Sequence, residues 1–551
     1  MTTPSSDEPA SDATADHAVG RSTRTRRQFL WGAGLGALTA GAAIGVGMPL
    51  IRGLASGSLP PRRVPVAPGS LRIDHVTVVD PRDGSRHDDA SILIRDGRII
   101  AVADVASLAS DPGVPTVDGA GRFAVPGYNN MHTHALQAQN PALMMATMLA
   151  EGVTGMRQML GTSEMLAHRA ANRLPLSVNA PRLLAMPGDI LTPFTAGSVD
   201  AVQKAIDSQY DDGADFIKMV LTDRDVFFAA VERAHAKGLR IAGHLPESVL
   251  PSEASAAGFD SIEPLGASDG IWIEASSRRD ELWAMDDTGL PLPAWIAGLP
   301  GVGGIFTATS EKKLINPAAF DSPDAVAFKR EAVQAFDEDR ARALAATFVK
   351  NDTWHAPTLV RLRTQYLMDS AEYETDPWLP LMTENARRDY DDVLATFREL
   401  PDITRQSYRD VYTAVLRVTK ILHDEGVPMM AATDGQGKAP GQRLQLEFQE
   451  LATAGIRPLD ILRMATTAPA RYLGRTATMG VIAPGADADL LLLASDPTLD
   501  VAALGSITAV VRDGHFIRAE DLEALIERLA EQPEDGSALG FARGAVAFEC
   551  C

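Results

Sequence analysis

The sequence predicts an α/β fold in which a (β/α)8 TIM barrel is accompanied by a small composite β-sandwich domain built from both ends of the chain. Three observations support this prediction. Eight short apolar segments alternate with helical patterns through the middle of the sequence. Short alternating strands flank this region on both sides. The 551 residues are enough for one large barrel and a smaller domain.

Two similar turns mark the flanking strands. Asp96 and Gly97 lie between β-rich runs near the amino end, and Asp513 and Gly514 do so near the carboxyl end. Asp-Gly between such flanks is a strong signal for a two-residue hairpin turn. Neither set of strands is large enough to form a stable sheet alone. We therefore expect residues 65–125 and 473–518 to combine into one β-sandwich.

Residues 126–472 are predicted to form the barrel. Its eight strands are expected to end near His134, Gln158, Met186, Lys218, His244, Leu265, Thr358 and Asp434. Helical patterns lie between them, including residues 225–237 and 340–351. Two connections are long, residues 266–352 and 360–426. Insertions of this kind cover the mouth of a barrel, so we expect them to recognise the substrate.

The amino terminus predicts export. The twin arginine Arg26-Arg27 precedes Phe29-Leu30 and a moderately apolar run over residues 31–51. This pattern resembles a twin-arginine export signal, which serves proteins that fold before they cross a membrane. An uncleaved anchor helix is the alternative, because the run is nearly long enough to span a bilayer. We assign residues 1–58 to a signal and linker, and expect a periplasmic or extracellular protein.

Composition and charge exclude several classes of site. The net charge of −21 argues against a nucleic-acid partner, because binding to phosphates relies on an excess of cationic side chains. The only cysteines are Cys550 and Cys551, so the body has neither a cysteine zinc site nor a disulfide framework. They belong to residues 519–551, where a surface helix over 519–532 precedes a loose tail.

Polar residues near the ends of the predicted strands indicate a metal site. His132 and His134 are two positions apart, and on a strand such residues face the same side. A lone lysine, Lys218, lies in an apolar run, while His244 and Asp434 each end one. The carboxyl ends of barrel strands meet at one mouth, which is where active sites are built. The imidazole pair therefore indicates a metal site at this mouth, where Lys218, His244 and Asp434 are also expected to gather.

Each candidate also has an ordinary structural explanation. Lys218 fits a lysine that extends from an edge strand to solvent. His244 fits a hydrogen-bonded core histidine, and Asp434 fits a cap for the following helix. The order of all the residues along the chain, His-x-His, Lys, His and Asp, favours the metal site.

In this order the chain resembles the amidohydrolase superfamily of metal-dependent hydrolases, from about residue 71 to residue 517. The resemblance includes Pro126-Gly127 before the His-x-His pair and the closing stretch 480–490, followed by Asp496-Pro497. Within the superfamily, the runs Phe-Ile-Lys-Met and Gly-His-Leu-Pro around Lys218 and His244 are most similar to imidazolonepropionases and Xaa-Pro dipeptidases.

The resemblance implies a metal centre and a reaction. Its ligands would be His132, His134, Lys218, His244 and Asp434, holding one or two divalent ions that we expect to be zinc. Lys218 would be N6-carboxylated and bridge two ions. A metal-bound hydroxide would cleave an amide, peptide or cyclic-amide C–N bond of a small-molecule substrate, with Asp434 as proton shuttle and His244 as metal ligand or substrate-orienting group. We also expect a homo-oligomer.

One position departs from the family pattern. Where the family usually has a further ligand histidine in a Ser-Ile-Glu-His run, this chain has Ser261-Ile262-Glu263-Pro264. Proline cannot bind a metal, so three outcomes stay open. The centre is mononuclear, recruits Glu263 or His355 instead, or has lost catalysis. The last outcome makes the chain a catalytically impaired barrel that acts as a binding protein, and an isomerase or deaminase on the same scaffold is a further alternative.

Overall fold

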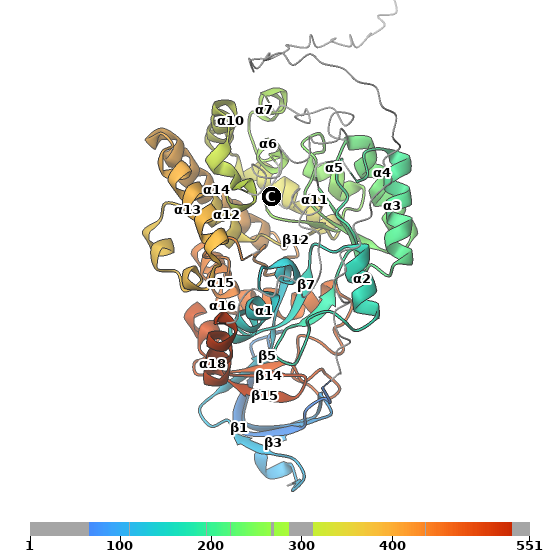
Figure 1. Ribbon diagram of the computed structural model, residues 1–551, viewed down its shortest axis with the longest axis vertical. Helices are drawn as coiled ribbons and strands as arrows, with labels where there is room; N and C mark the ends of the chain where they lie inside the picture. Colours follow the sequence, from blue (N-terminus) through green and yellow to red (C-terminus); the bar gives the residue numbers. More distant parts are fainter. Residues whose placement is uncertain are drawn as a thin grey trace, which may run out of the picture. The chain divides into compact units, whose positions relative to one another are not determined.

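The computed structural model describes residues 66–531 except 110, 194, 221, 266–268, 286–311 and 436. The predicted export signal and the two cysteines lie outside these residues. No helix within the described ranges combines the length and apolar character needed to cross a membrane. The described chain is a mixed α/β fold (Figure 1).

Strands from the two ends of the chain form one mixed sheet. It contains β1 (Leu71–Val79), β2 (Arg86–Arg95), β3 (Arg98–Asp104), β4 (Thr116–Asp118), β5 (Phe123–Pro126), β13 (Leu490–Leu493), β14 (Ile507–Arg512) and β15 (His515–Arg518). Their order is β15-β14-β13-β5-β1-β2-β3, with β4 beside β1. Antiparallel pairing of β5 with β13 joins the two ends, and both ends contribute to one apolar core. The second, facing sheet of a sandwich stays a prediction.

Both Asp-Gly turns are present. The φ angles are 48° and 72° at Asp96 and Gly97, and 54° and 78° at Asp513 and Gly514. Positive φ at both central positions is the geometry of a type I′ turn. The two turns meet at Gly69, whose N–H donates to the Asp513 carbonyl and whose carbonyl accepts from the Gly97 N–H, each at 2.9 Å.

Two parallel sheets form the centre of the protein. One contains β6 (Tyr128–Thr133), β7 (Val153–Gln158) and β8 (Arg182–Ala185). The other contains β9 (Phe216–Met219), β10 (Arg240–Gly243), β11 (Ser261–Ile262) and β12 (Trp354–His355). These strands end close to seven of the eight predicted positions.

Backbone contacts link the two parallel sheets at both edges. Near the eighth predicted position, Met429 forms a parallel bridge with His355, and Gly435 does so with Thr133. At the other edge, Leu191 bridges to Met219. The order of these contacts is the one that an eight-stranded barrel requires, and closure of the barrel stays a prediction.

Helices surround the parallel sheets. They are α1 (Pro141–Ala150), α2 (Ser163–Ala170), α3 (Val199–Asp211), α4 (Arg224–Ala236), α5 (Pro251–Ala256), α15 (Leu444–Thr453), α16 (Pro458–Ala465) and α17 (Thr467–Tyr472). Helix α18 (Ala519–Ala530) instead packs against α1, β14 and β15. The predicted helix over residues 225–237 corresponds to α4. The predicted surface helix at 519–532 corresponds to α18.

The two long connections carry helices of their own. These helices are α6 (Gly270–Glu274), α7 (Arg279–Met285), α10 (Pro323–Gln334), α11 (Glu338–Lys350), α12 (Leu359–Tyr366), α13 (Glu384–Arg398) and α14 (Asp402–Asp424). Helix α14 packs against α10, α11 and α12, so the two connections share one helical layer. In Figure 1, α10, α12, α13 and α14 lie together at the opposite end from β1 and β3.

Candidate metal centre

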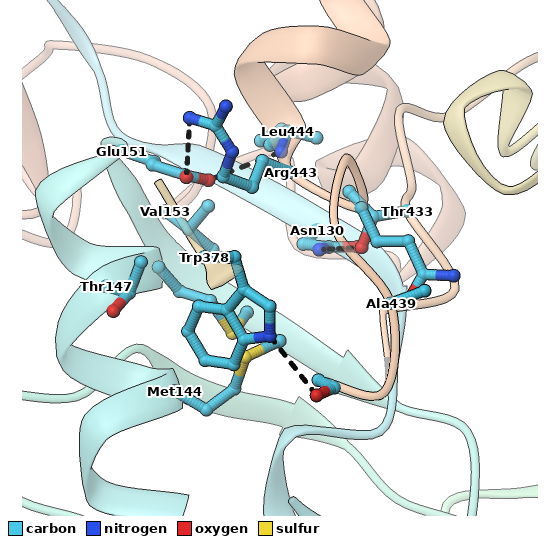
Figure 2. A pocket seen from close by; sticks show the side chains of 13 residues that line it. Asn130, Met144, Thr147, Glu151, Val153, Trp378, Thr433, Ala439, Arg443 and Leu444 are labelled. Atoms are coloured by element: carbon cyan, nitrogen blue, oxygen red, sulfur yellow. Dashed lines mark hydrogen bonds and ion pairs between the residues drawn. The ribbon is translucent and has the colours of Figure 1, made fainter. Parts of the chain in front are cut away.

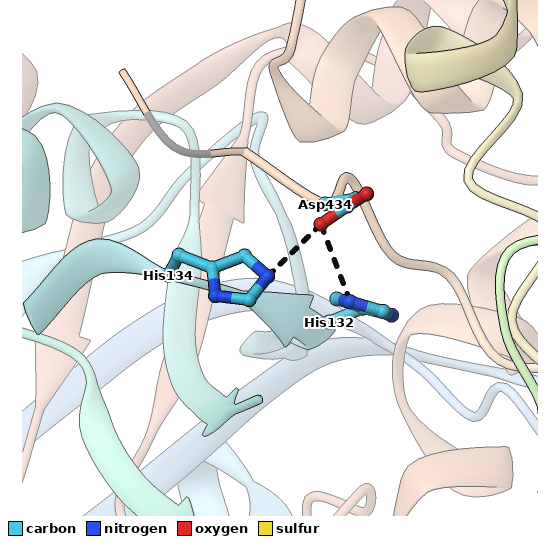
Figure 3. A group of neighbouring side chains, drawn as sticks. All are labelled: His132, His134 and Asp434. Atoms are coloured by element: carbon cyan, nitrogen blue, oxygen red, sulfur yellow. Dashed lines mark hydrogen bonds and ion pairs between the residues drawn. The ribbon is translucent and has the colours of Figure 1, made fainter. Parts of the chain in front are cut away.

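His132, His134 and Asp434 form a group that fits a metal ion (Figure 3). The Nε2 atoms of His134 and His132 lie 3.0 and 3.2 Å from Oδ1 of Asp434. One ligand atom from each residue lies within 4.8 Å of the other two, and all three residues are buried. Two imidazoles and a carboxylate are donors that zinc and related divalent ions prefer. Three of the five predicted ligands therefore converge.

Backbone bonds between two strand ends hold this group together. The N–H of Asp434 donates to the His132 carbonyl at 2.9 Å, and the N–H of His134 donates to the Gly435 carbonyl at 3.1 Å. Asp434 has a φ of 52°, a left-handed conformation that aspartate adopts more readily than most residues. These features place both imidazoles and the carboxylate on the same side.

Lys218 and His244 come from neighbouring strands. Lys218 of β9 is in register with Ala242 of β10, two positions before His244. Gly243 has a φ of 139°, and a Cβ atom there would lie 2.1 Å from the Met219 carbonyl oxygen. Glycine at this position is therefore required for the close approach of β10 to β9, which brings His244 beside Lys218.

Four buried polar atoms in this region have no hydrogen-bond partner among the described residues. They are Nε2 of His132, Nζ of Lys218, Nε2 of His244 and Oδ2 of Asp434. Leaving such an atom unsatisfied costs about 1–3 kcal/mol, so a cluster of them needs an explanation. A divalent ion bound there would satisfy the imidazole and carboxylate atoms among them, because these donor types fit such an ion.

The charges in the centre suit metal binding. Burial lowers the pKa of His244 well below its usual value, and nearby Lys218 adds to this effect. The ring is therefore neutral and has a free lone pair. Burial alone would raise the pKa of Asp434, but His132 and His134 outweigh it and hold that pKa well below the usual range. The carboxylate is therefore ionised.

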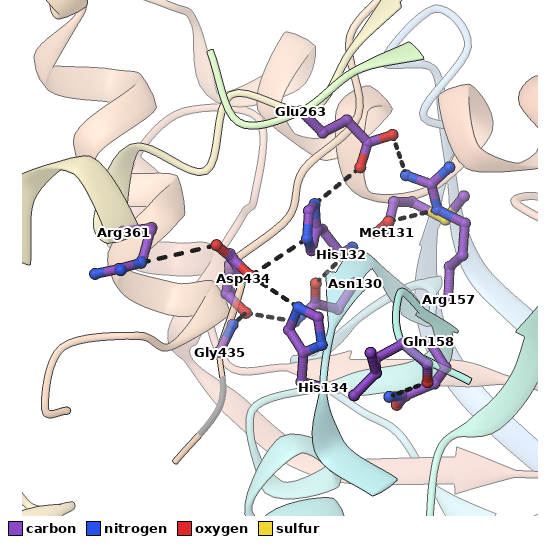
Figure 4. A network of polar contacts seen from close by, with 12 residues as sticks. Asn130, Met131, His132, His134, Arg157, Gln158, Glu263, Arg361, Asp434 and Gly435 are labelled. Carbon is purple, nitrogen blue, oxygen red and sulfur yellow. Dashed lines mark hydrogen bonds and ion pairs between the residues drawn. The ribbon is translucent and has the colours of Figure 1, made fainter. Parts of the chain in front are cut away.

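A second buried carboxylate lies on the side of His132 that faces away from Asp434 (Figure 4). Oε2 of Glu263 is 2.9 Å from Nδ1 of His132. Oε1 accepts hydrogen bonds from Arg157 Nη2 and Ser261 Oγ, each at 2.5 Å. Burial would raise the pKa of Glu263, but the Arg157 guanidinium and His132 hold it far below the ordinary value. Glu263 is therefore an ionised hydrogen-bond acceptor.

Neither predicted replacement for the missing histidine belongs to the three-residue group. The ring of His355 lies 4.6 Å from that of Phe348 on α11, and burial lowers the pKa of His355 to about 3. The carboxylate of Glu263 is already bonded to His132, Arg157 and Ser261. The segment that directly follows β11 therefore contributes to the centre through Glu263, which contacts a candidate ligand.

Sequence reasoning did not single out two buried arginines. Arg157 of β7 bonds to Glu263. Arg361 of α12 has its Nε 3.7 Å from Oδ2 of Asp434, and its Nη1 and Nη2 donate to the carbonyls of Ile315 and Leu314 at 3.0 Å each. Both arginines are at most 2% exposed. The sequence feature that could have identified them is an arginine within an apolar run. Such an arginine is expected to be buried, and a buried guanidinium needs hydrogen-bond acceptors around it.

A pocket lies between α1 and the segment that follows Asp434 (Figure 2). Its wall includes Asn130 and Thr433, which are joined by a hydrogen bond of 2.9 Å from Asn130 Nδ2 to Thr433 Oγ1. Oδ1 of Asn130 also accepts from the backbone N–H of His132 at 3.2 Å. Trp378 also lines the pocket, and its indole donates to the Gly437 carbonyl at 3.1 Å. This pocket wall therefore supports the backbone that carries the metal group.

Parts of the sequence are similar to known proteins. Residues 411–517 match the family model described as the Amidohydrolase family. This segment contains Asp434 and ends within β15. An imidazolonepropionase from Ralstonia nicotianae is 38% identical over 98 residues, which are 17% of this chain. The match spans only 24% of the length of that relative.

Solved structures share the fold over most of the chain. A Xaa-Pro dipeptidase with methionine bound in its active site is 17% identical, with 82% of this chain and 100% of that chain covered and a TM-score of 0.53. A bottromycin amidohydrolase is 21% identical, with 90% and 96% covered and a TM-score of 0.58. These structures show that the chain shares their fold, and the family-model match shows a sequence similarity to the Amidohydrolase family over residues 411–517.

Proposed function

We propose that this protein is a metal-dependent hydrolase that cleaves an amide, peptide or cyclic-amide C–N bond. The observation that carries the proposal is the convergence of His132, His134 and Asp434, with the unsatisfied atoms of Lys218 and His244 nearby. The family-model match supports it. So do the names of the relatives, which include an imidazolonepropionase, a Xaa-Pro dipeptidase and an amidohydrolase.

His132, His134 and Asp434 would hold a divalent ion, which we propose is zinc, at the mouth of a closed eight-stranded barrel. Lys218, as an N6-carboxylated side chain, and His244 would complete the centre. A bound divalent ion polarises the scissile carbonyl and makes water a stronger acid and nucleophile near neutral pH.

Asp434 would transfer the proton from the attacking water to the leaving group. Oδ2 of Asp434 is the oxygen without a hydrogen-bond partner, so it accepts the proton of the attacking water as the oxygen adds to the carbonyl carbon. The same oxygen returns the proton to the leaving nitrogen as the C–N bond breaks. Neutral His244 binds the metal or orients the substrate.

We also propose that the enzyme is exported and works as a homo-oligomer on small molecules. The twin arginine before an apolar run supports a periplasmic or extracellular location. The strongly negative net charge argues against nucleic acid as a partner.

Metal analysis combined with a substrate panel tests the proposed function. The protein is purified without added ions, and its divalent metal content per chain is measured. N-acyl amino acids, dipeptides and cyclic amides are then assayed before chelation, after chelation and after zinc is restored. We expect tightly bound metal and hydrolysis that chelation abolishes and zinc restores. Absence of both metal and hydrolysis would favour a binding protein on a catalytically impaired barrel.

A further inference from the structure

We propose that Glu263 is a positioning residue that fixes the tautomer of His132, so that the Nε2 lone pair of this ring faces the metal site. The inference rests on the proposed metal-dependent function. It assigns a role to the segment that directly follows β11, in which Pro264 stands where the superfamily pattern has a ligand histidine.

The contact between the two side chains determines which ring nitrogen carries the proton. Oε2 of Glu263 lies 2.9 Å from Nδ1 of His132, and both side chains are 0% exposed. Oε1 of Glu263 accepts from the Arg157 guanidinium, which is always charged, and a carboxylate paired in this way has no hydrogen to donate, so Nδ1 must be the donor. In a neutral imidazole the other nitrogen then has the lone pair. That nitrogen is Nε2, which lies 3.2 Å from Oδ1 of Asp434.

The carboxylate is itself held in place. Its Oε1 accepts from Arg157 Nη2 and from Ser261 Oγ. Arg157 in turn donates to the Met131 carbonyl and to the Tyr472 hydroxyl, the latter at 3.2 Å. One oxygen of Glu263 is therefore committed to two donors, and the other is left for His132. Metal-binding histidines commonly donate their second N–H to a carboxylate in this way, which fixes the ring and increases its basicity.

Glu263→Gln tests the proposal because it reverses the polarity at His132 without changing side-chain size. Arg157 and Ser261 are both donors towards Oε1, so the amide oxygen must face them. The amide NH2 then faces Nδ1 of His132, which has to accept. The ring proton moves to Nε2 and occupies the lone pair that would bind the metal.

The first measurement is zinc affinity of the full-length protein after metal removal, by competition with a chelator. We expect Glu263→Gln to weaken zinc binding about 10- to 100-fold. Glu447→Gln is the matched control, because Glu447 is also wholly buried but accepts from the backbone N–H of Val360 rather than from a ring. Its zinc affinity should equal that of the wild type. Equal affinity in Glu263→Gln and wild type would overturn the proposal.

The second measurement reads the tautomer itself. Long-range proton–nitrogen NMR spectra of metal-free protein labelled at histidine distinguish Nδ1–H from Nε2–H rings, and the His132 signal is assigned by its loss in His132→Gln. We expect Nδ1–H in the wild type and Nε2–H in Glu263→Gln. If the variant does not fold, the wild-type spectrum alone decides, because an Nε2–H ring at His132 contradicts the proposal.

These measurements separate the inference from the proposed function. A wild-type protein that binds no divalent metal would remove the proposed function, whatever the tautomer of His132. A wild-type protein that binds zinc tightly, together with a Glu263→Gln variant that binds it equally well, would remove the role of Glu263 alone.

Discussion

Nε2 of His134 lies 3.0 Å from Oδ1 of Asp434, although 300 positions separate the two residues in the chain. His132 approaches the same oxygen from the other side, at 3.2 Å. One oxygen of Asp434 is therefore shared by two imidazoles. The other, Oδ2, faces the Arg361 guanidinium at 3.7 Å and is the oxygen that we assign to proton transfer.

Replacing Asp434 by asparagine should lower kcat/KM about 10²- to 10⁴-fold, because an amide cannot accept and return the proton. Steady-state kinetics at saturating zinc, with circular dichroism as a check on folding, measure this effect. Asp424→Asn is the control, since Asp424 pairs with Lys420 on the exposed surface of α14, and it should behave as wild type. Unchanged activity in Asp434→Asn would remove this residue from the mechanism.

Zinc should stabilise the folded protein through His134. At a free zinc concentration of 100 times Kd, a ligand that binds only the folded state adds about 2.7 kcal/mol to the free energy of unfolding. We expect thermal unfolding of the chelated wild type to shift upwards when zinc is added, and little shift in His134→Ala. His423→Ala removes a histidine that contacts Asp424 at the end of α14 and should keep the full shift.

The protein should require carbon dioxide for full activity, because carbon dioxide would carboxylate Lys218. Lys329 is the lysine chosen for comparison. Carbamate formation needs a neutral amine. Burial would lower the pKa of Lys329, but Asp321 outweighs it and holds that pKa above its ordinary value, so this amine stays charged. Nζ of Lys218 has no hydrogen-bond partner among the described residues.

The test is metal loading with and without bicarbonate. We expect zinc content and activity of the wild type to fall when carbon dioxide is depleted and to return with bicarbonate. Lys218→Met should be insensitive to bicarbonate, whereas Lys329→Met should retain the response. A wild-type protein that loads zinc fully without carbon dioxide would contradict carboxylation.

Because of Glu447, the free energy of unfolding should decrease as pH rises. Burial raises the pKa of Glu447 from 4.5 to about 8, so the unfolded chain loses this proton near pH 4.5 and the folded chain keeps it until about pH 8. Unfolding therefore releases a proton between these values, and the free energy of unfolding falls as pH rises through this window. The total change is on the order of a few kcal/mol.

Urea unfolding at pH 5, 7 and 9 measures this effect. Glu447→Gln cannot lose a proton, so its free energy of unfolding should decline less with pH, and above pH 8 it should exceed that of wild type. Glu164→Gln changes a largely exposed carboxylate on α2 and should leave the pH dependence unaltered. Parallel pH profiles for Glu447→Gln and wild type would rule out this assignment.

Local patterns in the sequence predict the positions of the strands and three members of the metal group. The His132 and His134 pair follows from the two-residue period of a strand, and Asp434 follows from its place after an apolar run. The Asp-Gly turns follow from backbone preferences alone. Each of these features depends on residues that are neighbours in the chain.

The contacts that Glu263 and Arg361 make with the candidate ligands join residues that are far apart in the chain. Glu263 bonds to His132, 131 positions away, and to Arg157, 106 positions away. No local period encodes such a pair, so the sequence offered Glu263 only as one of two candidate replacement ligands and not as a partner of His132. Arg361 faces Asp434 only because α12 packs beside the centre, and the sequence of α12 alone does not determine that position.

The pairing of β5 with β13 has a consequence for biosynthesis. A ribosome releases β1 to β5 long before it reaches the strand that pairs with β5. Until then the N–H and C=O groups along that edge lack their strand partner, which is a risk for aggregation in a nascent chain. Every product of translation that stops before residue 490 keeps this edge open.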